Sequence, residues 1–141
     1  MLNLNISLES KKWLVIGGGT VATRRVKKIL KEEGHVRLIS PVASKPLLKI
    51  ESQNKNLKIV KRKFRKSDIG NQDFVLACTD SVRVNRDIVA TAKSKKILVS
   101  NASDKNDSEF SFTSTININR DIRINLSTDG KNPSFTKTLR I

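Results

Sequence analysis

The sequence has little of the chemistry that builds metal centres, disulfides or membrane spans. Its 141 residues include one cysteine, Cys78, and one histidine, His35. A lone cysteine cannot form an internal disulfide and a lone histidine cannot hold a metal, so we expect no structural metal. No stretch reaches the roughly 18–20 apolar residues that span a bilayer, and residues 1–5 lack the basic region and cleavage site of a secretory signal. We therefore expect a cytoplasmic protein with no membrane partner.

Acidic residues are also few. Thirteen Asp and Glu stand against 28 Lys and Arg, which leaves a formal charge of +15. A positive field favours anionic partners, such as nucleic acid, anionic lipid or a polyacidic small molecule. A drift in composition that places lysine on solvated faces explains the excess equally well. The length and the apolar fraction of 37% suit one globular domain, with or without a short appendage.

Strand-like and helix-like patterns alternate along most of the chain. Residues 12–16 form a short β-branched run that ends at three glycines, which is typical of a buried strand. Residues 20–33 have apolar positions at helical spacing, and Gly34 is the expected stop. Further elements follow in order: strands at 35–40, 57–61, 73–79 and 96–100, and helices at 42–52 and after Asp80 or Ser81. This alternation predicts an α/β fold, a Rossmann-type doubly wound parallel sheet.

The pattern changes after residue 109. Residues 110–118 and 121–127 alternate in polarity on either side of a short polar turn, which predicts an antiparallel β-hairpin. Such a hairpin is marginal by itself and must pack on the first domain or pair with a second copy of the chain. Residues 128–132 form a turn, and Pro133 can begin a final helix through Leu139. We divide the chain into domains at 1–109 and 110–141.

The glycines after the first strand form the pattern Gly17-x-Gly19-x-x-Ala22 between a strand and a helix, which is the context that a dinucleotide-binding motif requires. Gly17 permits the tight turn, Gly19 lets the backbone approach a pyrophosphate, and Ala22 allows close helix–strand packing. The start of the helix supplies free N–H groups and the positive end of its dipole. The alternative is a glycine turn used only for packing.

Other candidate residues follow the predicted strands. Where an acid normally binds the ribose of NAD, the chain has Ser40-Pro41-Val42, and Arg37 does not decide between NAD and NADP. Thr79-Asp80 ends the fourth strand at the topological switch point, where ligands bind, although helix capping explains it equally well. Asp104 follows the fifth strand on the same rim, or is a turn aspartate. Cys78 is expected in the core and His35 at the surface.

Several segments, in order along the chain, carry a family resemblance. They are 12–25, Ala-Cys-Thr-Asp at 77–80 with Val84-Asn85-Arg86, Val-Ser-Asn-Ala-Ser-Asp at 99–104, Phe-Ser-Phe at 110–112, and Ser-Thr-Asp-Gly-Lys-Asn-Pro-Ser at 127–134 with Leu139-Arg140. Together they resemble the precorrin-2 dehydrogenases of siroheme synthesis, which also occur as the N-terminal half of multifunctional siroheme synthase.

The resemblance implies an NAD-dependent oxidation of precorrin-2 to sirohydrochlorin, with ferrous iron insertion in some members. It places the family's key aspartate at Asp104, as base or proton relay, and NAD contacts at Thr20, Val21 and near Val42. It implies a homodimer formed through the hairpin, which makes 1–109 an NAD-binding domain and 110–141 a dimerisation segment. The anionic tetrapyrrole suits the basic chain. The expected cofactor contacts are Gly17, Gly18, Gly19, Thr20, Val21, Ala22, Ser40, Pro41, Val42, Thr79 and Asp80.

The chain departs from the family pattern in three places. Asp129 precedes Gly130 where the family has a second glycine, the loop at 105–109 is more polar, and the sequence ends at Ile141 where family members usually continue with a helical segment. Two other classes stay open. A non-enzymic module that senses NAD(H) would bind cofactor without turnover. A nucleic-acid binder is the weakest reading, because Lys and Arg are scattered and few aromatic residues can stack on bases.

Overall fold

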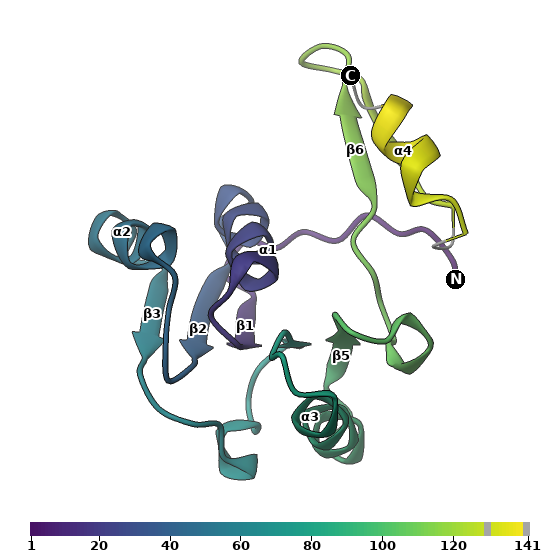
Figure 1. Ribbon diagram of the computed structural model, residues 1–141. Helices are drawn as coiled ribbons and strands as arrows, with labels where there is room; N and C mark the ends of the chain where they lie inside the picture. The colour runs from purple at the N-terminus through teal and green to yellow at the C-terminus, as the bar shows by residue number, and fades with distance from the viewer. Residues whose placement is uncertain (129–130, 140–141) are drawn as a thin grey trace. The chain divides into compact units, whose positions relative to one another are not determined.

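The computed structural model describes residues 1–128 and 131–139, so Asp129, Gly130 and Arg140, which carry part of the family resemblance, lie outside the described residues. The chain forms two compact units, residues 1–110 and 111–141 (Figure 1). Within the described ranges, no helix is long and apolar enough to cross a membrane.

The first unit is built on a five-stranded parallel sheet with the strand order β3-β2-β1-β4-β5. Its strands are β1 (Lys12–Ile16), β2 (His35–Ile39), β3 (Leu57–Val60), β4 (Phe74–Ala77) and β5 (Leu98–Asn101). The chain order reverses between β1 and β4, where Ile16 lies beside Ile39 on one side and Ala77 on the other. The predicted doubly wound parallel sheet is confirmed.

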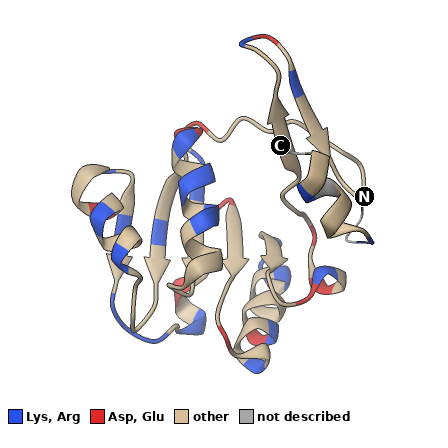
Figure 2. Ribbon diagram, turned by 45° about the horizontal axis from the view of Figure 1, so that its top comes forward, with Lys and Arg blue, Asp and Glu red and all other residues tan. Residues whose placement is uncertain are grey.

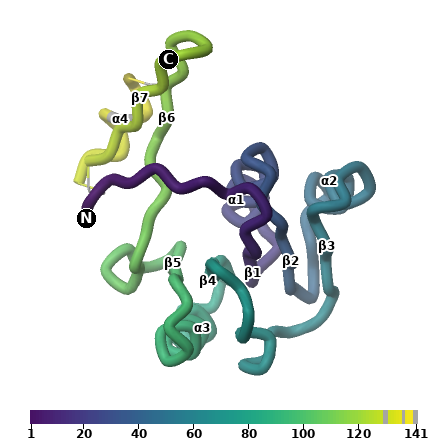
Figure 3. Tube along the Cα trace, turned by 180° about the vertical axis from the view of Figure 1, so that it is seen from behind, coloured from purple at the N-terminus to yellow at the C-terminus, as the bar shows by residue number. Residues whose placement is uncertain are grey.

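Helices cover both faces of this sheet. Helices α1 (Thr20–Lys31) and α2 (Lys45–Gln53) lie on one side, and α3 (Val82–Ser94) lies on the other (Figures 1 and 3). Successive side chains of a strand point to opposite faces of the sheet. Leu14 and Ile16 therefore belong to the core cluster on the α3 side, and Trp13 and Val15 lie on the opposite face. All four are buried, which explains why β1 reads as a continuous apolar run.

In each of the two edge strands of the sheet, a backbone N–H that points away from the sheet donates a hydrogen bond to a glutamate carboxylate. The N–H of Ile59 in β3 donates to Glu51 Oε1 of α2 over 2.8 Å. The N–H of Val99 in β5 donates to Glu109 Oε2 over 3.1 Å, and the Glu109 N–H donates back to the Val99 carbonyl. Phe110 then packs edge-on against Trp13 and Phe74, so it belongs to the first unit.

The structure selects Ser81 from the two predicted caps of α3, whereas the end of α1 differs from the sequence-based expectation. Helix α3 is capped by Ser81, whose hydroxyl accepts the Val84 N–H, while Asp80 lies one residue earlier. At the end of α1 the left-handed residue is Glu33, with φ of 62°, and not Gly34. Gly34 is required for a different reason: a Cβ atom there would collide with the Ile29 side chain. Close packing, not backbone conformation, selects this glycine.

The second unit contains a two-stranded antiparallel sheet, β6 (Ser114–Asn117) and β7 (Arg123–Leu126), followed by α4 (Pro133–Leu139). The predicted hairpin is confirmed, with shorter strands, because the Asn119 side chain accepts the N–H groups of Asp121 and Ile122 in a wider turn. Ile116 pairs with Ile124, and alternation puts both on one face.

Candidate functional site

A cavity of about 920 Å³ opens at the carboxyl ends of β1, β2 and β4, where the strand order reverses. This is the place where ligands bind in doubly wound sheets. Ten of the predicted cofactor contacts line it, and they come from three separate loops. They are Gly17, Gly18, Gly19, Thr20, Val21, Ser40, Pro41, Val42, Thr79 and Asp80. Ala22, the remaining predicted contact, does not line the cavity, because its side chain is fully buried.

Gly17 makes the turn out of β1 against the end of β4. Its φ of 117° lies in a region that other L-residues rarely adopt, and a Cβ atom would collide with the Cys78 carbonyl group. Its N–H donates to the Ile39 carbonyl over 3.0 Å. The residue therefore joins the ends of three adjacent strands, and only glycine fits.

Gly18 fits the glycine loop against the loop between β2 and α2. A Cβ atom here would collide with the Val42 carbonyl oxygen, and the Gly18 carbonyl accepts the Ser44 N–H over 2.9 Å. The Ser44 hydroxyl shares a hydrogen bond of 2.8 Å with Thr23 of α1 and caps α2 at Leu47. These contacts fix the relative position of the two loops that face the cavity.

Gly19 has no protein atom near the position that a Cβ atom would occupy. A glycine is therefore not required at this position by the backbone, whose φ is −92°, or by packing within the chain. It precedes α1, where helix geometry leaves the N–H groups of Thr20, Val21 and Ala22 without intrahelical acceptors. An open approach beside unsatisfied N–H donors and a positive helix dipole suits a pyrophosphate. The residues present fit a dinucleotide.

Asn85 ties the end of β4 to the end of β5. It is fully buried in α3, and its Oδ1 accepts both the Thr79 N–H, over 3.1 Å, and the Thr79 hydroxyl, over 2.7 Å. Its Nδ2 donates to the Thr79 carbonyl and to the Ser103 hydroxyl. Ser103 in turn donates through its hydroxyl to Asn101, which is also buried. The cavity end of β4 is thereby linked to the turn that carries Asp104.

Asp104 does not line this cavity. It caps the short 3₁₀ turn η2 (Lys105–Asp107), where its side chain accepts the Asn106 N–H over 3.0 Å. The side chain is half-buried and lies on the same rim of the sheet. The structure thus shows the capping role that the sequence left open as an alternative, and the catalytic assignment stays a prediction.

Cys78 faces the cavity from the end of β4. Burial raises the pKa of the Cys78 thiol to about 11, although the positive charge of Arg25 opposes the shift. The thiol is therefore neutral near pH 7 and a poor nucleophile. The sequence predicted Cys78 in the core. In the structure the residue is only partly buried and lies at the boundary of the core.

The loop after β3 supplies cavity residues that the sequence analysis missed. Lys63, Phe64 and Lys66 line the cavity, and Phe64 also packs against the α3 side of the core. Sequence periodicity gave no sign of this, because the loop has neither strand nor helix spacing. Its basic composition was the one available signal.

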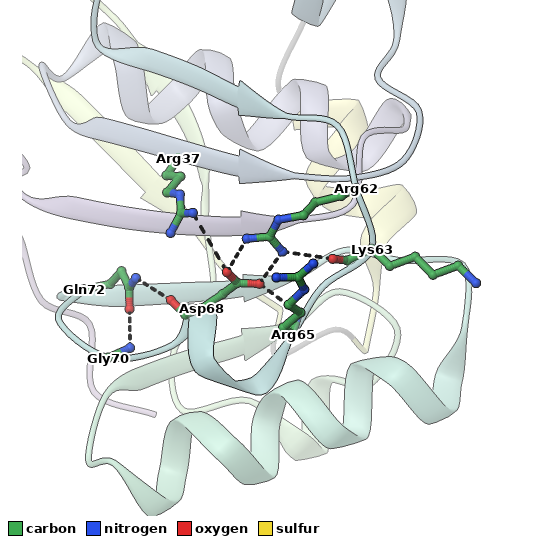
Figure 4. Close-up of polar contacts among 7 residues, drawn as sticks. All are labelled: Arg37, Arg62, Lys63, Arg65, Asp68, Gly70 and Gln72. Atoms are coloured by element: carbon green, nitrogen blue, oxygen red, sulfur yellow. Dashed lines mark hydrogen bonds and ion pairs between the residues drawn. The ribbon is translucent and has the colours of Figure 1, made fainter.

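An ion-pair cluster around Asp68 holds this loop (Figure 4). Asp68 is buried; its carboxylate accepts two hydrogen bonds from the Arg62 guanidinium, at 2.6 and 2.9 Å, and one from the Arg65 N–H. The Arg62 hydrogen bonds lower the pKa of Asp68. Arg37 also approaches Asp68, at 3.9 Å, so its charge is directed to a carboxylate of the protein.

In the part of the chain that the structure describes, no group of three or more His, Cys, Asp or Glu side chains could hold a metal ion. The cavity instead presents glycine backbone, hydroxyls, two lysines and the carboxylates of Asp80 and Asp87. This set suits an organic anion.

Comparison with known proteins agrees with this geometry. A protein family described as "Putative NAD(P)-binding" matches residues 4–114. The precorrin-2 dehydrogenase of Bacillus subtilis is 34% identical over 139 residues, which cover 99% of this chain and 84% of that protein. The chain belongs to the precorrin-2 dehydrogenase family.

Two further relatives support the assignment. The precorrin-2 dehydrogenase of Priestia megaterium is 29% identical, with 99% of this chain and 68% of that protein covered. The solved structure of SirC, a precorrin-2 dehydrogenase, matches with a TM-score of 0.80 and 28% identity, over 99% of this chain and 68% of that one. Family membership supports a nicotinamide cofactor in the cavity at the switch point.

Proposed function

We propose that the protein is a precorrin-2 dehydrogenase that oxidises precorrin-2 to sirohydrochlorin in siroheme synthesis, with NAD as hydride acceptor. The observation that carries this proposal is the open glycine loop at the switch-point cavity, in a chain related to precorrin-2 dehydrogenases over nearly its whole length. The fit of a dinucleotide at Gly19 supports the cofactor.

In this mechanism the backbone N–H groups at the start of α1 bind the pyrophosphate of the dinucleotide. The bound nicotinamide supplies the hydride acceptor. Thr79 is held rigidly by Asn85, so the end of β4 offers a fixed wall to the cofactor. We assign to Asp104, on the same rim of the sheet, the role of accepting the proton that the oxidation releases, because a carboxylate can act as a general base.

The charge of the chain suits a polycarboxylate substrate. Figure 2 shows Lys and Arg distributed over the helices and loops of the first unit, with fewer acidic residues among them. A formal charge of +15 raises the local concentration of an anionic tetrapyrrole and speeds its association.

We also propose that two copies of the chain associate through the β6–β7 hairpin, and that the protein is cytoplasmic. Several isoleucines lie on one face of the hairpin. Ile118, Ile122 and Ile124 are 58%, 48% and 40% exposed. A two-stranded sheet with such a face is marginally stable unless it is covered.

Anaerobic incubation of the protein with precorrin-2 and NAD tests the function. We expect absorbance of sirohydrochlorin to appear with the reduction of NAD. Cofactor binding without conversion by a dimeric preparation would favour the alternative, a non-enzymic NAD(H) sensor. Addition of ferrous iron to the product tests iron insertion separately.

Asp104→Ala tests the base. We expect NAD affinity to stay within about twofold while turnover falls by roughly 10²–10⁴, the usual contribution of a general base. Asp107→Ala is the matched control, because Asp107 lies in the same turn and its carboxylate pairs with Lys93 near the surface. Normal turnover in Asp104→Ala would remove Asp104 from the mechanism.

A further inference from the structure

The end of β2 lacks the carboxylate that selects NAD in many dinucleotide-binding proteins. An acid there binds the ribose hydroxyls and repels a 2′-phosphate. In this chain the position is Ser40, which is buried and donates its hydroxyl proton to the Val42 carbonyl over 2.7 Å. The two carboxylates that line the cavity, Asp80 and Asp87, come from the β4–α3 side. Among the described residues, no carboxylate at the end of β2 lines the cavity.

Cations stand close to this end of the cavity. The Ser40 N–H donates to the Val60 carbonyl over 3.2 Å, so the end of β2 lies beside the end of β3. The chain runs from there directly into the basic loop at 61–66. Two residues of this loop, Lys63 and Lys66, line the same cavity as Ser40.

Arg62 differs from the two lysines of this loop that line the cavity. Arg62 is committed to Asp68, and its Nη1 also donates to the Lys63 carbonyl over 3.0 Å. The Lys63 backbone is therefore fixed, while Figure 4 shows its ammonium group extending away from Asp68. Among the described residues, neither Lys63 nor Lys66 forms an ion pair with a carboxylate. The protein holds this loop in place by one set of charges and leaves another set for a ligand.

We propose that the cavity accepts NADP as well as NAD, with Lys63 and Lys66 binding the 2′-phosphate of the adenosine ribose. The inference rests on the proposed function, because it assigns the adenosine end of the same dinucleotide site. A 2′-phosphate gains charge-assisted hydrogen bonds from the two ammonium groups. The adenosine ribose of NAD carries no phosphate at this position. The two lysines are therefore expected to strengthen the binding of NADP and not that of NAD.

Calorimetric titration of the full chain with NAD and NADP tests this assignment, with 5′-AMP and 2′,5′-ADP as fragments that differ only in the 2′-phosphate. We expect NADP to bind at least as tightly as NAD, and 2′,5′-ADP more tightly than 5′-AMP. Lys63→Ala and Lys66→Ala should each weaken NADP by up to about tenfold, and NAD by less than about twofold. Lys63→Arg should retain NADP binding. Lys61→Ala is the matched control, because this exposed lysine of the same loop does not line the cavity.

Three results would overturn the inference. NADP binding more than about tenfold weaker than NAD binding would show that the site excludes the phosphate. Equal losses of NAD and NADP in the lysine variants would show a general electrostatic effect, as would a matching loss in Lys61→Ala. Each of these leaves the dehydrogenase proposal intact. A different result would overturn the proposed function and the inference with it. This result is a wild-type protein that binds neither NAD nor NADP, or that oxidises precorrin-2 with neither of them.

Discussion

Gly17 and Gly19 are separated by one residue, yet the structure itself requires a glycine only at the first of them. Gly17 has a positive φ and no room for a side chain against Cys78. Gly19 has an ordinary φ and open space. The first glycine is therefore a requirement of folding, and we propose that the second allows the approach of the ligand.

Alanine substitutions should separate these two roles. Gly17→Ala is expected to lower the free energy of unfolding by more than about 1–2 kcal/mol, because it combines strain with a collision against backbone. Gly19→Ala should change stability by less than about 0.5 kcal/mol and should weaken dinucleotide binding. Urea unfolding and calorimetric titration measure the two effects. Gly70→Ala, at another open glycine, is the control; strong cofactor binding by a folded Gly19→Ala protein would contradict the assignment.

Much of the candidate site could be predicted at the scale of residues, because the glycine motif has fixed spacing relative to a strand and a helix. The positions of Lys63 and Lys66 could not be predicted, since the sequence of an irregular loop does not reveal which of its residues border a cavity. The sequence placed Asp104 on the correct rim. It could not show that the carboxylate would cap a turn outside the cavity.

At the scale of elements, the buried amide of Asn85 holds two strand ends and one helix together. Asn85→Ala would leave the Thr79 N–H without its acceptor inside the protein. We expect a loss of about 1–3 kcal/mol in the free energy of unfolding, and faster hydrogen exchange at Thr79 and Ser103. Asn106→Ala, at an exposed position of η2, is the matched control. Equal stability of the two variants would show that the network is dispensable.

The Asp68 cluster gives the loop after β3 a dependence on pH. Arg62 lowers the pKa of Asp68 below its ordinary value of 3.8, so the ionised form stabilises the folded state. This contribution is complete above the ordinary pKa and is lost as the pH falls through the lowered one. Urea unfolding should therefore show a stability gap between wild type and Asp68→Asn that is full at pH 7 and shrinks in acid. A gap that is independent of pH would contradict this account, and Asp121→Asn controls for the general effect of acid.

The elements themselves were mostly predictable, because strands that are buried on both faces are apolar throughout, as in β1 and β4. Their ends were less so. Either Asp80 or Ser81 can cap a helix by chemistry, and the choice of Ser81 depends on the path of the β4 loop in three dimensions. The hairpin turn was wider than expected, because Asn119 folds its side chain back onto the following backbone.

At the scale of the whole molecule, self-association can be tested on the two faces of the hairpin. Ile124→Lys places a charge on the isoleucine face, opposite Ile116, and we expect it to yield a monomer. Asn125→Lys places the same charge on the other face and should leave a dimer. Light scattering coupled to size exclusion measures both masses. A dimeric Ile124→Lys protein would show that the copies meet elsewhere.

The two glutamates at the outer strands affect how copies of this protein can meet. An exposed strand normally offers a row of vacant donors and acceptors that invites another strand to extend the sheet, which is a route to aggregation. Here Glu51 and Glu109 each occupy an outward amide, so an added strand would have to displace a bound carboxylate at both borders. Addition of a strand at either border would cost a hydrogen bond that the protein already makes, which disfavours aggregation through the edges of the parallel sheet.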